Sequence, residues 1–227
     1  MLLGPRVRVL AIETSGPRGS VALLENTELV LELEHEQPNA HAEQILPLVE
    51  RALSSAGFDR RSLDRIAVGI GPGSFTGLRV GIALGEGLAL GLDLPIVGVS
   101  SLRAMAAAAP ASEPRVRVPV LDARRSEIFA AAYDAEGSEK MAPCAIPIAE
   151  AGARFRELAC ELLFVGGFAS VVAPDADRLE GREFDLPRAR WVGVVGAQLD
   201  PAAHPPDPIY VRGAGATLPN LPPSPLS

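Results

Sequence analysis

The chain has 227 residues, of which 48% are hydrophobic, 22% are charged and 4% are aromatic. This composition is typical of a globular protein with one large or two small domains, and it excludes intrinsic disorder over most of the length. The formal net charge of −7 makes the surface as a whole repel a phosphate backbone, so we expect no direct binding of nucleic acid. Two cysteines, Cys144 and Cys160, are too few for a disulfide framework or a zinc site, which fits a reducing, cytoplasmic compartment.

The first 35 residues predict a β-meander. Residues 7–14 form an apolar run that ends at the turn-forming cluster 15–19, and strand-like runs follow at 20–24 and 28–34. Arg6 and Arg8 lie inside the apolar stretch of residues 1–16, which therefore predicts a strand and not a signal peptide.

Two long helices are predicted in the first half. Within 40–56, apolar residues recur every three or four positions, and Gly57 follows as an end signal. A buried strand at 66–70 leads through a glycine-rich loop at 71–77 into a second helix that continues to Leu92, and a strand at 96–99 and a helix at 100–109 follow. The apolar region 80–102 is broken by Glu86 and Asp93 and falls short of the ~20 residues that span a bilayer, so we expect no membrane segment.

The second half of the chain repeats the first. The run at 6–9 recurs at 115–118, Glu13 recurs at the same offset as Asp122, and the strand that runs into glycine at 68–71 recurs at 165–167. The repeat predicts an α/β fold of two lobes, an N-terminal lobe at 1–105 and a degenerate C-terminal lobe at 106–212. Residues 213–227 are rich in proline and are expected to form a disordered tail.

The loop 71–77 and the helix after it each have two interpretations. Glycines let the loop turn sharply, and Ser74 or Thr76 is suited to cap the helix. The loop is therefore either a plain helix-start turn or an anion-binding site. It does not contain a Walker motif. Gly77, Gly81 and Gly85 share one face of the helix. Because glycine costs ~1 kcal/mol in a helix interior, this face predicts the close approach of another segment, from this chain or from another subunit.

Glu13-Thr14-Ser15 and Asp122 place two carboxylates at the ends of equivalent strands. In a duplicated fold such ends face each other and suit a magnesium nucleotide, whereas a single acid at such a place usually caps a turn. The three histidines lack the spacing of a helical metal pair and no serine-hydrolase elbow is present, so little supports a zinc enzyme or a hydrolase.

Several motifs taken together resemble the TsaB family, also called YeaZ, over residues 7 to about 212. The family provides a subunit of the bacterial system that makes N6-threonylcarbamoyladenosine at adenosine 37 of tRNAs that read ANN codons. The motifs are Ala11-Ile12-Glu13-Thr14-Ser15, Gly69-Ile70-Gly71-Pro72-Gly73-Ser74-Phe75-Thr76-Gly77-Leu78-Arg79-Val80-Gly81, Leu94-Pro95-Ile96-Val97-Gly98-Val99-Ser100-Ser101-Leu102, Asp122-Ala123-Arg124-Arg125 and Pro208-Ile209-Tyr210-Val211-Arg212.

The resemblance implies an actin-like ATPase (ASKHA, ribonuclease H-like) duplicated two-lobe fold with a reduced second lobe. It implies a non-catalytic subunit without cofactor or metal, in which Glu13, Thr14, Ser15 and Asp122 are remnants of a nucleotide cleft. Family members usually carry aspartate at the position of Glu13, which weakens any expectation of nucleotide hydrolysis. The catalytic relative, TsaD, holds its metal with a His-x-x-x-His pair that this chain lacks.

The resemblance also implies partners. A TsaD-type transferase pairs with the chain through helices of the N-terminal lobe, a TsaE-type ATPase docks on the heterodimer, and the chain forms a homodimer when alone. The resemblance also favours contact between another subunit and the glycine stripe, which we define as Gly77, Gly81 and Gly85. The expected interface consists of Ile45, Leu46, Val49, Leu53, Gly73, Ser74, Phe75, Thr76, Gly77, Leu78, Val80, Gly81, Leu84 and Gly85.

Two other functions stay open. The acids at 13 and 122 motivate an actin-like-fold enzyme, a small-molecule kinase or a transferase, with its own ATP site. A protease that acts on its partner is the third hypothesis, but the sequence offers it no recognisable nucleophile and base.

Overall fold

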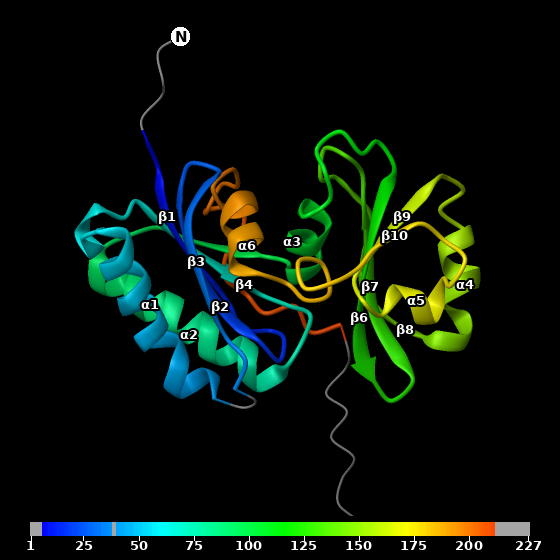
Figure 1. Ribbon diagram of the computed structural model, residues 1–227, viewed down its shortest axis with the longest axis horizontal. Coiled ribbons are helices and arrows are strands. Elements are labelled where there is room, and N and C mark those ends of the chain that lie inside the picture. The colour runs from blue at the N-terminus through cyan, green and yellow to red at the C-terminus, as the bar shows by residue number, and fades with distance from the viewer. Residues whose placement is uncertain (1–5, 38–39, 212–227) are drawn as a thin grey trace, which may run out of the picture.

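The structure is a computed structural model and describes residues 6–37 and 40–211. Two five-stranded sheets form two lobes that lie side by side (Figure 1). The predicted tail at 213–227 lies outside the described residues.

The first lobe contains the predicted meander and two parallel strands. Its sheet has the order β3-β2-β1-β4-β5, in which β1, β2 and β3 pair antiparallel while β4 and β5 continue parallel to β1. The strands are β1 (Arg8–Glu13), β2 (Gly19–Glu25), β3 (Glu28–His35), β4 (Arg65–Gly69) and β5 (Ile96–Val99). A short 3-10 turn, η1 (Arg60–Ser62), precedes β4.

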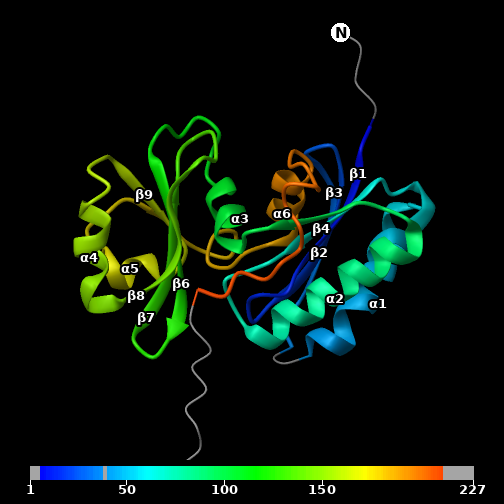
Figure 2. The ribbon, with the colours of Figure 1, turned by 180° about the vertical axis from the view of Figure 1, so that it is seen from behind.

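Helices cover both faces of this sheet. On one face lie α1 (His41–Ala56) and α2 (Phe75–Leu92), packed on alternate residues such as Leu10 and Ile12 of β1 (Figures 1 and 2). On the other face α3 (Ser101–Ala107) and α6 (Ala189–Gly196) pack on Val9 and Ala11. The period of two in β1 thus gives each helical layer its own set of side chains.

Local sequence sets the ends of these helices. Ser74 and Ser100 are the N-caps of α2 and α3, and their hydroxyls accept hydrogen bonds from the N–H groups of Gly77 and Arg103. Gly57 ends α1 with φ at 68°, a left-handed conformation that glycine adopts without strain. The predicted range of α1 is confirmed to within one residue at each end. The predicted end of α2 at Leu92 is confirmed, whereas its start at Phe75 lies inside the predicted loop 71–77.

The second lobe repeats the strand order of the first. Its sheet, read from the other edge, is β8-β7-β6-β9-β10, which matches β3-β2-β1-β4-β5 strand for strand. The strands are β6 (Val116–Arg124), β7 (Glu127–Tyr133), β8 (Glu139–Pro147), β9 (Leu162–Val165) and β10 (Arg178–Leu179). The duplication is confirmed. The lobe is reduced, because α4 (Ile148–Arg156) and α5 (Ala169–Val172) have 9 and 4 residues against 16 and 18 in α1 and α2.

The predicted extent of the second lobe, to residue 212, needs correction. After residue 187 the chain returns to the first lobe, where α6 packs on the first sheet and residues 198–211 continue along it (Figure 1). Two glycines allow this close packing, since a Cβ at Gly193 would lie 2.2 Å from Leu24 Cδ1 and one at Gly196 would lie 2.6 Å from Ala67 Cβ. Helical periodicity indicates that such a helix is buried but not which sheet it covers.

Candidate functional site

Glu13, the first residue of the predicted cleft, is completely buried at the end of β1. Its Oε2 accepts a hydrogen bond of 2.8 Å from Ser101 Oγ, and its Oε1 accepts one of 2.6 Å from the N–H of Ser15. The carboxylate fits because Gly69 has no side chain, since a Cβ there would lie 2.1 Å from Oε2. Burial raises the pKa of Glu13 against the opposing effect of these hydrogen bonds. Both oxygens are therefore occupied within the protein.

The hydrogen bonds of Glu13 belong to a network that holds the loop 71–77. Ser101 Oγ also accepts the N–H of Gly71 at 3.2 Å, while the carbonyl of Gly71 accepts the N–H of Ser101 at 2.8 Å. The carbonyl of Ser15 accepts the N–H of Ser74 at 2.7 Å. Because Ser74 also caps α2, the structure shows the loop as a helix-start turn, the simpler of its two interpretations.

Asp122, the second predicted acid, lies in a different environment. It is exposed near the end of β6, where its Oδ1 accepts the N–H of Arg124 at 2.7 Å and its Oδ2 pairs with the Arg124 guanidinium at 3.2 Å. One acid is thus enclosed and the other caps its own turn, so the structure does not present them as a facing pair. In the described part of the chain no three His, Cys, Asp or Glu side chains are grouped as metal ligands.

Apolar side chains, which sequence reasoning missed, fill the space between the lobes. We call them the interlobe cluster: Leu102, Met105 and Ala106 of α3, Leu121, Ala131 and Tyr133 of β6 and β7, Val165 of β9, and Phe184 and Leu186 of the segment before α6. Leu186 also packs on the β1–β2 turn, with its Cδ2 3.8 Å from the place of a Cβ at Gly16. Burial raises the pKa of Tyr133 to about 12. Apolar packing therefore joins the two lobes.

The glycine stripe of α2 faces the inside of its own chain. A Cβ at Gly77 would lie 2.1 Å from the carbonyl oxygen of Thr14, one at Gly81 would lie 2.2 Å from Thr14 Oγ1, and one at Gly85 would lie 2.4 Å from Val68 Cγ1. Thr14 Oγ1 donates a hydrogen bond of 2.8 Å to the carbonyl of Gly77. The assignment of these glycines to another subunit is therefore corrected, because strands β1 and β4 are what approach α2 closely.

The other predicted interface residues divide by exposure. Ile45, Val49 and Leu78 are buried in the first core and are likewise corrected. Leu53, Gly73, Val80 and Leu84 are half-buried, while Leu46, Ser74, Phe75 and Thr76 are exposed.

The opposite side of α2 is exposed and largely apolar, with Arg79 and Glu86 as its charged residues. We define the outer face as Leu46 of α1 with Phe75, Ala83, Gly87, Leu90 and Gly91 of α2, all of them exposed. Leu90 is 87% exposed, and a Cβ at Gly87 or Gly91 would meet no atom within 4 Å. The spacing of Ala83, Gly87 and Gly91 at every fourth residue was a signal that the sequence offered.

By length and composition α2 is apolar enough to cross a membrane, and it is the one such helix among residues 6–37 and 40–211. Only 33% of it is buried inside the protein. Its inner side nevertheless packs on the sheet, so the helix is a component of the fold that leaves an apolar side uncovered.

Aromatic rings and a guanidinium cover the first turn of α2. Phe75 and Tyr210 are 54% and 49% exposed, and their ring centroids are 5.5 Å apart. The guanidinium of Arg79 lies 3.9 Å from the centroid of the Phe75 ring. Tyr210 thus adjoins the outer face at its N-terminal end.

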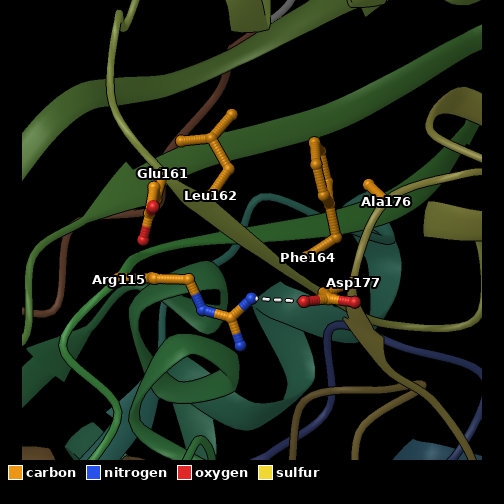
Figure 3. Close-up of a pocket in the computed structure, with 6 residues that line it drawn as sticks. All are labelled: Arg115, Glu161, Leu162, Phe164, Ala176 and Asp177. Atoms are coloured by element: carbon orange, nitrogen blue, oxygen red, sulfur yellow. Dashed lines mark hydrogen bonds and ion pairs between the residues drawn. The ribbon is translucent and has the colours of Figure 1, made fainter.

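A hollow on the second lobe lies away from all these residues. It has a volume of about 680 Å³ and is lined by Arg115, Glu161, Leu162, Phe164, Ala176 and Asp177 (Figure 3). Arg115 Nη1 pairs with Asp177 at 2.6 Å across the hollow, and Arg115 also binds Glu113, whose pKa it lowers to about 2. The guanidinium of Arg115 is therefore paired within the protein.

The sequence model of the family described as TsaD, tRNA N6-adenosine threonylcarbamoyltransferase, matches residues 33–169, more than half of the chain. The chain belongs to the TsaD family. Within this family, it is 41% identical over 128 residues to the tRNA threonylcarbamoyladenosine biosynthesis protein TsaB of Escherichia coli K12, a match that covers 56% of this chain and 55% of that protein. The chain spans about half the length of the curated relatives it matches.

Solved structures support the same relationship within the TsaD family. YeaZ from Pseudomonas aeruginosa superposes with a TM-score of 0.73 at 28% identity, covering 90% of this chain and 99% of that one. The activator of 2-hydroxyisocaproyl-CoA dehydratase from Clostridium difficile has a TM-score of 0.50 at 10% identity, covers 84% of this chain and 94% of that one, and bears on the fold alone. The resemblance to TsaB and the actin-like two-lobe fold are confirmed.

Proposed function

We propose that this chain is a non-catalytic subunit that binds and activates a TsaD-type transferase, which forms N6-threonylcarbamoyladenosine at position 37 of ANN-decoding tRNAs. The outer face carries the proposal: α2 is mostly apolar, with Arg79 and Glu86 as its charged residues, yet Leu90 is 87% exposed and two thirds of the helix is not buried. An exposed, largely apolar surface of this kind typically marks a protein–protein interface. The relatives named TsaB support the choice of pathway.

The remaining parts of the proposal rest on the net charge and on the resemblance to the TsaB family. With a net charge of −7 the chain leaves tRNA binding to its partner, and it works in the cytoplasm. A TsaE-type ATPase docks on the heterodimer, and without its partner the chain forms a homodimer through the outer face. The chain itself supplies no catalytic residue and no cofactor.

An actin-like-fold enzyme with its own ATP site is the alternative, motivated by the acids at 13 and 122. The burial of Glu13 and the interlobe cluster argue against it. ATP turnover by the isolated chain that is abolished by Asp122→Ala would support the alternative over the subunit.

Size-exclusion chromatography with light scattering tests the proposal. The chain is run alone and mixed with the TsaD-type protein of its own organism, and we expect a homodimer to be replaced by a heterodimer. Absence of any complex at all salt and nucleotide conditions would overturn the proposed function.

A substitution on the outer face locates the interface. Gly87→Leu places a bulky side chain where a Cβ now meets nothing, so we expect loss of the heterodimer while the monomer stays folded. Ala153→Leu, at an exposed position of α4 on the second lobe, is the matched control and should pair normally. Normal pairing by Gly87→Leu, measured by the same chromatography, would move the interface away from the outer face.

A further inference from the structure

The last described residues cross the first lobe as an extended strap. The carbonyl of His204 accepts the N–H of Gly98 at 2.9 Å, and the N–H of Ile209 donates to the carbonyl of Ile70 at 2.8 Å. Gly98 gives the strap room, since a Cβ there would lie 2.5 Å from the carbonyl oxygen of Pro205. Ile209 packs on the first core. The strap therefore holds the chain across the ends of β4 and β5.

The strap ends at the outer face. Tyr210 contacts Phe75, the first residue of α2, and Arg79 covers the same ring from one turn further along. Because Phe75, Arg79, Ala83, Gly87 and Gly91 follow one another at four-residue spacing, they form one row along the helix. Tyr210 stands at the N-terminal end of that row.

The composition of residues 212–227 suits this surface. After Arg212 no residue in them is charged, and they contain prolines 219, 222, 223 and 225 and leucines 218, 221 and 226. Proline-rich apolar segments bind shallow apolar surfaces edged by aromatic rings, in an extended conformation that costs little entropy to order. At about 3.1 Å per residue, the 16 residues are long enough to pass the whole of α2, whose 18 residues rise about 1.5 Å each.

We propose that residues 212–227 dock on the outer face of their own chain and compete there with the partner subunit. This inference rests on the proposed function for the identity of the competitor but not for the docking itself. The attachment at Tyr210 keeps the segment at a high effective concentration near the outer face, so weak contacts are enough to cover it. An arriving partner then has to displace the segment, which lowers its apparent affinity by the fraction of chains that are uncovered.

A spin label tests the docking on the isolated chain. The protein is kept at a concentration at which light scattering shows a monomer, because the proposed homodimer would cover the same face. The variant Leu90→Cys, with Cys144→Ser and Cys160→Ser, carries a nitroxide on the outer face, and the NMR signals of Leu218, Leu221 and Leu226 are recorded with the label oxidised and reduced. We expect strong broadening of these signals. The same label at Ala153→Cys on the second lobe is the control and should leave them sharp. Equal signals for both label positions would overturn the docking.

Partner affinity tests the competition. A chain that ends at Val211 and the length-matched variant Leu218→Ser/Leu221→Ser/Leu226→Ser should both bind the TsaD-type protein about three- to tenfold more tightly than the full chain. Unchanged or weaker binding would overturn the competition, and weaker binding would show that the segment is an additional arm on the partner. If no form of the chain binds the partner, the proposed function fails, while the spin-label result still decides the docking.

Discussion

Glycines with the same spacing on α2 have opposite environments. Gly81 faces Thr14, with 2.2 Å from a Cβ to Oγ1, whereas Gly87 faces open space. The sequence indicates that a glycine-rich helix needs close neighbours on one side, but periodicity cannot tell which side lies against the sheet. That information comes from β1 and β4, which are remote in sequence.

We expect the same substitution to alanine to have opposite effects on stability at Gly81 and at Gly87. Gly81→Ala should lower the free energy of unfolding by about 1–3 kcal/mol, because the new methyl group overlaps Thr14. Gly87→Ala should raise it by up to about 1 kcal/mol, since alanine favours the helix and nothing obstructs its methyl group. Urea denaturation measures both, and the reverse order would contradict the placement of the two faces.

Two buried histidines predict a dependence on pH. His41 Nε2 lies 3.0 Å from the carbonyl oxygen of Gly16 and must donate to it, so His41 Nδ1 accepts from His35 Nε2 at 3.1 Å. His35 Nδ1 is then left buried, without a hydrogen-bond partner among residues 6–37 and 40–211. Burial, and secondarily the proximity of His41, lowers the pKa of His35 below its ordinary value of 6.5.

The lowered pKa of His35 makes the stability of the folded chain depend on pH. Below pH 6.5 the unfolded chain takes up a proton on His35 that the folded chain resists, so stability should fall as the pH drops from 7 to 5. His35→Gln should show a smaller fall than the parent chain. Urea denaturation at pH 5, 6 and 7 compares them, and identical pH profiles would remove His35 as the cause.

At the scale of elements, most of the fold was predictable. The meander, α1 and α2 have clear periods, and the repeat at an offset of 109 residues predicted the second sheet, since it brings Glu13 onto Asp122. The destination of α6 was not predictable, because its apolar residues suit either sheet. Nor was the interlobe cluster, whose members come from five separate segments.

An arginine of the first sheet fixes the end of α6. Arg65 Nη1 donates to the carbonyls of Gly196 and Leu199, each at 2.7 Å, and so satisfies groups that a helix end leaves free. Arg65→Ala should lower the free energy of unfolding by about 1–3 kcal/mol, because these carbonyls lose a charged donor. Thermal or urea denaturation measures the change, with exposed Arg51→Ala as the control. Equal stability of the two variants would show that α6 does not depend on this cap.

At the scale of the whole molecule, apolar packing joins the two lobes, between which the sequence predicted the remnant of a nucleotide cleft. Because Phe184 and Leu186 belong to the interlobe cluster, a nucleotide would have to expose that cluster to water. We therefore expect millimolar MgATP to leave the melting temperature of the isolated chain unchanged. Differential scanning calorimetry checks this, and a rise that saturates with nucleotide concentration would show a functional site.

The second lobe begins after α3 and ends before α6, and both of these helices pack on the first sheet. The second lobe is thus an insertion into the first lobe, which holds both of its attachment points (Figure 1). The outer face, the strap and the long helices α1 and α2 all belong to the first lobe. Shortening the helices of such an insertion leaves the outer face of the first lobe in place. The shortness of α4 and α5 relative to α1 and α2 is confined to this insertion.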